Sequence, residues 1–172
     1  MILDLRKYED FPVRELLDIE PSQVRLFRDD VKKIISVLID LSIQKSSEEY
    51  FCRSKITARV MLECSRCLEE TLTELYETAD FIICSANRTA VKDKDIVDDE
   101  DYVYYQGDEL RVDLSDIVYQ TLILALPMKP LCSETCRGLC PRCGMNLNTG
   151  RCNCRVKEPD ERWRGLRNLF NQ

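Results

Sequence analysis

The chain has no histidine, only five glycines and no long uncharged segment. The absence of histidine excludes zinc sites with mixed cysteine and histidine ligands, and it excludes catalytic triads that depend on an imidazole. The five glycines form no phosphate-binding loop. The longest uncharged run, residues 117–128, has twelve residues, whereas a helix that spans a bilayer needs about 20. We therefore expect neither an enzyme nor a membrane protein.

The first residues also lack the features of a secretory signal, because Asp4, Arg6 and Lys7 precede any apolar stretch. We therefore expect a cytoplasmic protein. In this reducing compartment cysteines remain thiols or bind metal, and they rarely form disulfides.

Ten cysteines are present, and a group of six falls within the 23 residues from 132 to 154. These six are Cys132, Cys136, Cys140, Cys143, Cys152 and Cys154. Cys140 and Cys143 are separated by two residues and followed by Gly144, which lets the backbone turn so that both sulfurs face one tetrahedral ion. The spacing is that of a zinc knuckle, and we expect zinc held only by thiolates.

The sequence leaves the grouping of these ligands open. Short gaps favour a single zinc held by the first four cysteines of the segment: Cys132, Cys136, Cys140 and Cys143. Cys152 and Cys154 could replace the first two of these as the second pair. They could also join Cys64 and Cys67 in a second site, since eight cysteines satisfy two ions.

Charge is distributed unevenly along the chain. Residues 1–128 carry 16 basic and 27 acidic side chains, a net charge of −11, and residues 129–172 carry nine basic and four acidic side chains, a net charge of +5. We expect a core domain at 1–128 and a basic zinc module at 129–172. Five basic residues lie within or beside the cysteines: Arg137, Arg142, Arg151, Arg155 and Lys157. They suit contacts with RNA phosphates, although arginines also keep a small metal module soluble.

Alternating apolar residues predict an antiparallel sheet in the core domain. Every second residue is apolar over 35–43, and after a polar turn the alternation resumes over 52–62. Residues 71–84 are rich in threonine and in aromatic and branched side chains, which predicts a third strand. We expect Cys52 and Cys84 to be buried within these strands. The predicted fold class is α+β, with a meander that is either open or barrel-like.

A helix and several smaller features complete the prediction. We expect a short strand at 102–105, and then a helix that Asp113 caps and Pro127 ends, with its apolar face packed on the sheet. The six acids in residues 93–101 predict a solvated loop. A last short helix is expected over 159–170.

Three separated segments of the chain resemble one protein family. They are the turn Cys64-Ser65-Arg66-Cys67, the helix that ends in Leu-Ala-Leu-Pro-Met, and the cysteine-rich stretch from Cys136 to Cys154. In this order they are similar to the large-subunit ribosomal RNA accumulation protein family of bacteria and plastids, YceD. The resemblance covers nearly the whole chain. It implies a factor that is needed for normal levels of large-subunit ribosomal RNA.

The resemblance also implies which positions carry the shared role. The family's turn matches Cys64, Arg66 and Cys67, whereas the C-terminal cysteines are absent from some members, so zinc is expected to stabilise the module. We predict a non-enzymatic factor in large-subunit biogenesis that binds ribosomal RNA or a pre-ribosomal particle. A large-subunit ribosomal protein is a further expected partner.

Two other functions stay open at this point. The acidic body could belong to an adaptor that binds a basic ribosomal protein without contacting RNA. Alternatively, Cys64 and Cys67, with Arg66 between them, could form the redox pair of a thiol oxidoreductase. Such pairs usually open a helix, whereas this one is expected between two strands.

Overall fold

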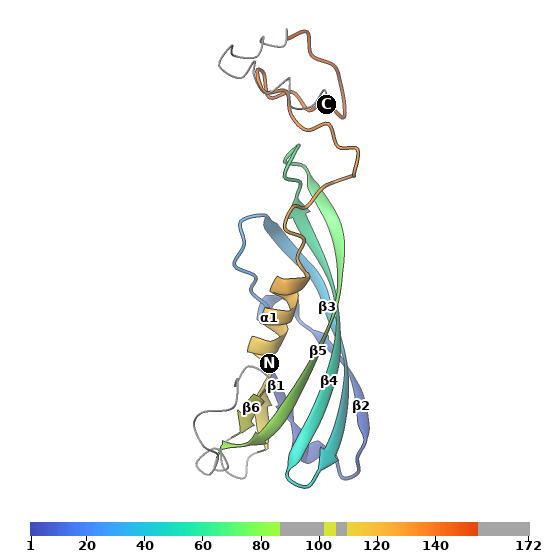
Figure 1. The fold of residues 1–172 in the computed structure, drawn as a ribbon, viewed down its shortest axis with the longest axis vertical. Coiled ribbons are helices and arrows are strands. Elements are labelled where there is room, and N and C mark those ends of the chain that lie inside the picture. Colours follow the sequence, from blue (N-terminus) through green and yellow to red (C-terminus); the bar gives the residue numbers. More distant parts are fainter. Residues whose placement is uncertain (87–101, 106–109, 155–172) are drawn as a thin grey trace, which may run out of the picture.

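The structure is a computed structural model of the chain, and it describes residues 1–86, 102–105 and 110–154. A long, twisted sheet with one helix against it forms the body, and the cysteine-rich residues extend from one end of the sheet (Figure 1). In this part of the chain, no helix is both long enough and apolar enough to cross a membrane.

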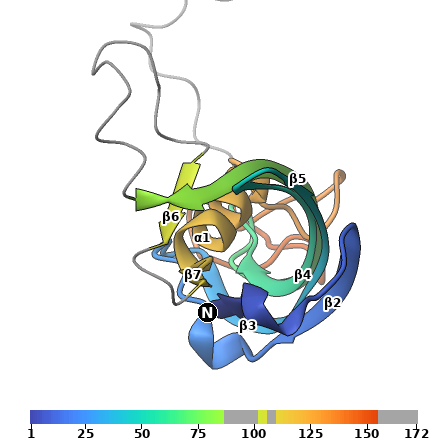
Figure 2. The same cartoon turned by 90° about the horizontal axis from the view of Figure 1, so that it is seen from below.

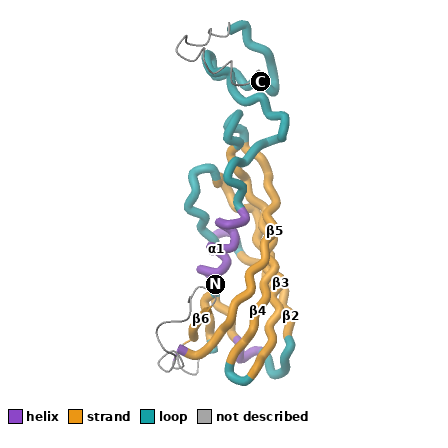
Figure 3. Tube along the Cα trace, in the orientation of Figure 1, coloured by secondary structure: helices purple, strands orange, loops and turns teal. Residues whose placement is uncertain are grey.

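Three long antiparallel strands form the centre of the sheet: β3 (Val31–Ser46), β4 (Glu49–Glu63) and β5 (Glu70–Ser85). They confirm the predicted meander and the α+β class. A shorter strand, β2 (Val13–Ile19), pairs antiparallel with β3, and β6 (Tyr102–Tyr105) pairs parallel with β5. The order is β2-β3-β4-β5-β6, so the sheet has two edges and does not close into a barrel (Figure 3).

The remaining elements are short. β1 (Ile2–Asp4) and β7 (Arg111–Asp113) form a separate antiparallel pair, and two 3-10 turns occupy Leu5–Lys7 and Pro21–Gln23. The helix, α1, runs from Ser115 to Ala125. Figure 2 shows the sheet curling around this helix, so that α1 fills the inner side of the curve.

The core lies between α1 and the inner face of the sheet. Along β4, alternate residues are buried, and Ile56, Val60 and Leu62 are at most 1% exposed. The helix contributes Val118 and Leu122, which are 4% and 1% exposed. Every second residue of the strand and one face of the helix are thus buried in this core, as the apolar pattern predicts.

Two local predictions are wrong. Ile35 was expected on the inner face but is 39% exposed, because a register shift between Ile34 and Ser36 moves it to the other face. The helix cap is Leu114 and not Asp113, which ends β7. The Asp113 carboxylate nevertheless accepts a hydrogen bond from the backbone N–H of Ser115 at 2.9 Å, so it still satisfies a free donor of the first turn.

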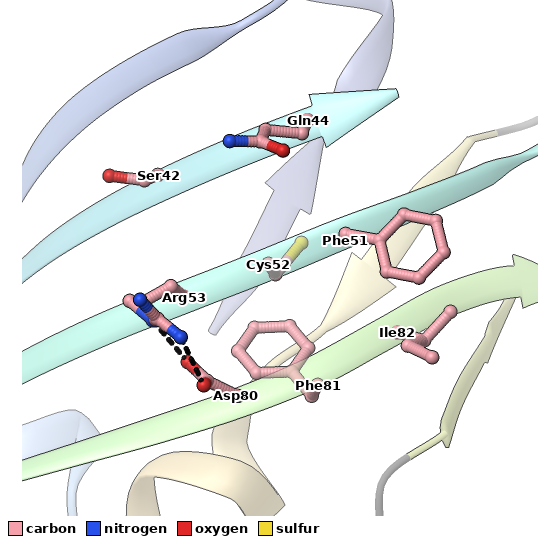
Figure 4. A pocket seen from close by; sticks show the side chains of 8 residues that line it. All are labelled: Ser42, Gln44, Phe51, Cys52, Arg53, Asp80, Phe81 and Ile82. Atoms are coloured by element: carbon pink, nitrogen blue, oxygen red, sulfur yellow. Dashed lines mark hydrogen bonds and ion pairs between the residues drawn. The ribbon is translucent and has the colours of Figure 1, made fainter. Parts of the chain in front are cut away.

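The outer face of the sheet carries paired charges beside exposed apolar side chains. A shallow hollow of about 610 Å³ lies over β3, β4 and β5, and the Arg53 guanidinium within it makes two hydrogen bonds to Asp80, at 2.8 and 2.7 Å (Figure 4). Arg59 forms a longer ion pair with Glu74 across β4 and β5, at 3.4 Å. Arg53 and Arg59 of this face are therefore each paired with an acid of the neighbouring strand.

Several predictions fall outside the described residues. They are the acidic loop at 93–101, the helix over 159–170, Arg155 and Lys157. The boundary between the core domain and the zinc module at residue 128 stays a prediction.

Candidate metal centres

Four cysteine sulfurs meet where the sheet joins the cysteine-rich segment, residues 129–154. The turn between β4 and β5 supplies Cys64 and Cys67, and the segment that follows the helix supplies Cys132 and Cys136. The four Sγ atoms all lie within 4.8 Å of one another, with 3.8 Å between Cys64 and Cys136 and 3.5 Å between Cys67 and Cys132. All four are free thiols. We call this group the joint site.

The joint site fits a tetrahedral thiolate-bound ion. Four sulfurs at 2.3 Å from a central zinc would lie roughly 3.8 Å from each other, which is close to the spacing found. Cys64, Cys67 and Cys136 are at most 4% exposed, and the side chains of Leu131 and Leu139 pack against them. Cys132 is the exposed member of the four. Four soft sulfur donors, three of them buried, are suited to zinc or a similarly thiophilic metal.

Hydrogen bonds to the sulfurs favour the thiolate form of two of the four cysteines in the joint site, Cys64 and Cys136. Burial would raise the pKa of Cys64, but backbone N–H groups of Arg66, Cys132 and Cys67 outweigh it and bring this pKa to about 6. The Asn148 amide, which donates to Cys136 Sγ at 3.3 Å, lowers the pKa of that thiol. The N–H of Glu69 lowers the pKa of Cys67, yet burial and the neighbouring sulfurs raise it to about 12. A divalent cation would remove this repulsion between sulfurs.

A second group of four cysteines lies farther along the chain. Its members are Cys140, Cys143, Cys152 and Cys154, whose Sγ atoms also lie within 4.8 Å of one another. We call this group the distal site. It provides a second set of four thiolate donors at metal-binding spacing.

The predicted knuckle turn forms half of the distal site. The backbone N–H of Arg142 donates to Cys140 Sγ at 3.5 Å, and Gly144 donates to the carbonyl of Cys140 at 2.9 Å with a positive φ of +72°. Backbone N–H groups of Cys143 and Arg142 bring the pKa of Cys140 to about 6. The neighbouring sulfur of Cys143 raises the pKa of Cys154 to about 12.

Arg66 connects the two parts of the protein at the joint site. Its backbone carbonyl accepts a hydrogen bond from Leu139 N–H at 3.1 Å, and its guanidinium donates to the carbonyls of Cys136 and Glu134 at 2.8 and 3.3 Å. Gly138 lies against it with a φ of +73°, and a Cβ atom there would be 2.9 Å from the Arg66 carbonyl oxygen. The arginine of the family's turn therefore positions the cysteine-rich segment.

Further hydrogen bonds tie the segment to itself and to the turn. Asn148 accepts from the backbone N–H of Arg137 at 2.7 Å, and the N–H of Leu147 donates to the Gly138 carbonyl at 2.9 Å. The Asn146 amide donates to Glu69 at 3.3 Å. These contacts are all hydrogen bonds between polar groups. The segment is therefore organised by its sulfurs and its hydrogen bonds more than by an apolar core of its own.

All eight cysteines that the sequence offers as metal ligands fall in these two groups, but their grouping differs from the favoured one. The four residues Cys132, Cys136, Cys140 and Cys143 do not surround a single point, because the first pair faces the β4–β5 turn and the second faces Cys152 and Cys154. The alternative in which Cys152 and Cys154 partner Cys140 and Cys143 is the one in the structure. Cys64 and Cys67, the pair of the redox hypothesis, lie within the joint site.

The two cysteines outside these groups are buried, as predicted. Cys52 in β4 and Cys84 in β5 are 4% and 5% exposed. Burial raises the pKa of Cys52 to about 12, which keeps it a neutral thiol.

The described basic residues of the segment are exposed. Arg137 follows Cys136 of the joint site, Arg142 lies between Cys140 and Cys143 of the distal site, and Arg151 precedes the last two cysteines of the distal site. The segment, which contributes to both cysteine groups, thus presents guanidinium groups to the solvent.

A family model matches residues 52–170, a range that includes both cysteine groups. Its description is large ribosomal RNA subunit accumulation protein YceD. The chain belongs to the YceD family. Two plant relatives carry the name large ribosomal RNA subunit accumulation protein YCED homolog 1, chloroplastic. This YceD name describes an accumulation protein and states no reaction.

The relatives of this YceD chain are longer than it is. The Arabidopsis thaliana protein is 30% identical over 76 residues, which cover 44% of this chain and 24% of that protein. The Zea mays protein is 33% identical over 66 residues, which cover 38% and 22%. An uncharacterized protein of Mycobacterium tuberculosis is 32% identical over 135 residues, which cover 74% of this chain and 59% of that protein. No solved structure matches the chain.

Proposed function

We propose that this YceD protein is a non-enzymatic factor in large ribosomal subunit biogenesis that binds ribosomal RNA or a pre-ribosomal particle in the cytoplasm. The observation that carries the proposal is the family match over residues 52–170. It coincides with the part of the chain that forms the two thiolate groups and their exposed arginines. Accumulation of an RNA is most simply supported by a protein that binds it or its precursor particle.

The metal in this proposal is zinc, with one ion in the joint site and one in the distal site. Cytoplasmic thiolate groups of four cysteines with no other ligand are typical of structural zinc. A closed set of four protein ligands leaves no open position for a substrate, so the ions would stabilise the fold and perform no catalysis.

The RNA-binding surface in this proposal is the basic face of the cysteine-rich segment. Its described members are Arg137, Arg142 and Arg151, and Arg155 and Lys157 follow them along the chain as further predicted RNA-binding residues. Guanidinium groups bind phosphate oxygens in two-pronged geometry. Among the described residues, Arg137, Arg142 and Arg151 form no ion pair with an acid, whereas Arg53 and Arg59 of the outer sheet face do. Glu134 is the one acid in residues 129–154.

A second candidate function is an adaptor that binds a basic large-subunit ribosomal protein. The observation that favours it is the net charge of −11 on residues 1–128, which opposes RNA and attracts a basic partner. In this case the cysteine-rich segment would be structural and the acidic body would form the interface.

Affinity purification with and without nuclease separates the two functions. The tagged protein is recovered from cells of its own organism, and the co-purified RNA and proteins are identified before and after digestion of RNA. The proposal predicts large-subunit ribosomal RNA in the untreated sample and loss of the ribosomal proteins after digestion. Retention of one basic ribosomal protein after digestion would favour the adaptor, and absence of any ribosomal component would contradict both.

A further inference from the structure

The free edge of β2 is the feature that the proposed function leaves unexplained. β2 pairs with β3 along its full length, Val13–Ile19, and stands at the end of the strand order. Among the described residues no other strand pairs with it, and Figure 2 shows it at the outer margin of the curl. Such an edge presents backbone N–H and C=O groups that another strand can bind.

The sequence limits where a second strand could pair with this edge. Pro12 precedes Val13, and Pro21 lies two residues beyond Ile19, so the segment between them is bounded on both sides by residues without an N–H donor. The central residue of this segment is Leu16. Its side chain is 70% exposed on the outer face of the sheet. Edge strands usually avoid pairing with other strands by carrying charged residues, prolines or bulges. An exposed apolar residue at the centre of an edge is therefore unusual.

The charges on either side of Leu16 are self-complementary. Arg14 and Asp18 lie two residues before and two residues after it, and all three side chains are exposed on one face of the strand. In an antiparallel pair of β2 strands centred on Leu16, Arg14 of each copy would lie opposite Asp18 of the other copy, so two opposite-charge pairs would form. The two Leu16 side chains would face each other between them.

We propose that β2 pairs with β2 of a second copy of this chain, about a two-fold axis at Leu16. The pairing joins two five-stranded sheets edge to edge. Two opposite-charge pairs and one leucine pair specify its register, because a shift by two residues would place Leu16 against Asp18. A two-fold axis makes such an interface closed, so it yields a dimer and no longer polymer.

The present partner of Arg14 is compatible with this arrangement. Its guanidinium donates two hydrogen bonds to Asp40 of β3, at 2.7 and 2.5 Å. A guanidinium has five donors, so it can hold Asp40 and the carboxylate of a second copy together. The interface is one short strand wide and smaller than a standard protein–protein interface, so the dimer should dissociate on dilution.

Sedimentation equilibrium of the full zinc-loaded chain, from micromolar to near-millimolar concentration, tests the proposal. We expect a reversible monomer–dimer equilibrium for the unaltered protein. Arg14→Asp and Asp18→Arg should each raise the dissociation constant at least tenfold, since each places two like-charge pairs across the axis. The double variant restores opposite charges in exchanged positions, and it should return the constant to within about threefold of the original value.

A matched control separates the interface from a general charge effect. Arg53→Asp removes an exposed Arg–Asp pair between neighbouring strands, as Arg14→Asp does, but on the central strand β4. It should leave the dimer unchanged. The proposal is overturned by a protein that is monomeric at all concentrations, by a dimer that neither single variant weakens, or by a double variant as weak as the single ones.

Discussion

At the scale of single residues, Arg66 and Gly138 form the contact on which the joint between sheet and cysteine-rich segment depends. The arginine uses its carbonyl and its guanidinium to bind three backbone groups of the segment, at Leu139, Cys136 and Glu134. Gly138 permits this approach because it has no Cβ atom and tolerates a positive φ. Both residues act on the geometry of the thiolate group beside them.

Replacing Gly138 by alanine should therefore destabilise the zinc-loaded protein. A positive φ alone costs alanine about 1–2 kcal/mol. The Cβ atom would in addition lie 2.9 Å from the Arg66 carbonyl oxygen, which adds about 1 kcal/mol or more. The free energy of unfolding, measured by urea denaturation in the presence of zinc, gives the size of the effect.

Gly144 supplies the control for this measurement. Its φ is +72°, nearly that of Gly138, but a Cβ atom at Gly144 would meet nothing within 4 Å. Gly144→Ala should show the backbone cost alone. Equal losses for the two variants would mean that the contact with Arg66 contributes nothing.

The chemistry of single residues is more predictable from the sequence than their contacts. Cysteine spacing and the lack of histidine single out the eight cysteines whose sulfurs the structure brings into two groups. The residues that support the cysteines are harder to find. Asn148 donates a hydrogen bond to the sulfur of Cys136, and Arg66 donates to the carbonyl of the same residue, which lies far from it along the chain. Their spacing in the sequence carries no signal of these contacts.

At the scale of elements, α1 is held to the sheet by its buried face. Leu122 is 1% exposed and packs in the core, whereas Leu124, two residues later, is 80% exposed. Leu122→Ala should lower the free energy of unfolding by about 2–5 kcal/mol, through lost burial and the cavity left behind. Chemical denaturation measures this loss.

Leu124→Ala is the matched change on the same helix. It removes the same atoms from an exposed position, and alanine is a strong helix former, so we expect a change within about 0.5 kcal/mol. A loss of several kcal/mol for Leu124→Ala would show that its face is covered in solution.

The strands differ in how well the sequence predicts them, and the reason is the regularity of their alternation. β3, β4 and β5 alternate over long runs, and the prediction of their meander is confirmed. The sequence pattern does not predict β2, because its inner face includes the acidic Glu15 and its outer face includes the apolar Leu16, which interrupts the alternation of apolar and polar residues. The parallel pairing of β6 with β5 depends on how the chain returns from residue 86 to residue 102, which local patterns do not encode.

At the scale of the whole molecule, the structure makes the sheet and the cysteine-rich segment one unit through the joint site. Two of its ligands come from the β4–β5 turn and two from residues 132–136, so a bound ion would crosslink distant parts of the chain. From the short gaps within the segment, the sequence instead favours a single ion held by the four cysteines from 132 to 143. It did contain a signal for the alternative, since the eight cysteines come in four closely spaced pairs that can each turn toward a different partner.

Zinc stoichiometry tests this division of the ligands. Elemental analysis of the purified protein should find two zinc ions per chain. Cys64→Ser with Cys67→Ser should remove the ion of the joint site, and Cys152→Ser with Cys154→Ser that of the distal site, which leaves one zinc in each case. A single zinc bound by the four cysteines from 132 to 143 would instead leave the stoichiometry at one in the unaltered protein and in both variants.

The central claim is that the basic face of the cysteine-rich segment binds ribosomal RNA through its phosphates. The most direct test is the affinity of the zinc-loaded protein for large-subunit ribosomal RNA fragments as a function of salt concentration. We expect the logarithm of the affinity to fall linearly with the logarithm of salt, and the Glu variant of Arg137, Arg142 and Arg151 to reduce the slope by about 2. Charge reversal of Arg53, Lys55 and Arg59 on the outer sheet face should leave the slope unchanged. An affinity that does not depend on salt, or that survives the first set of reversals intact, would contradict the account.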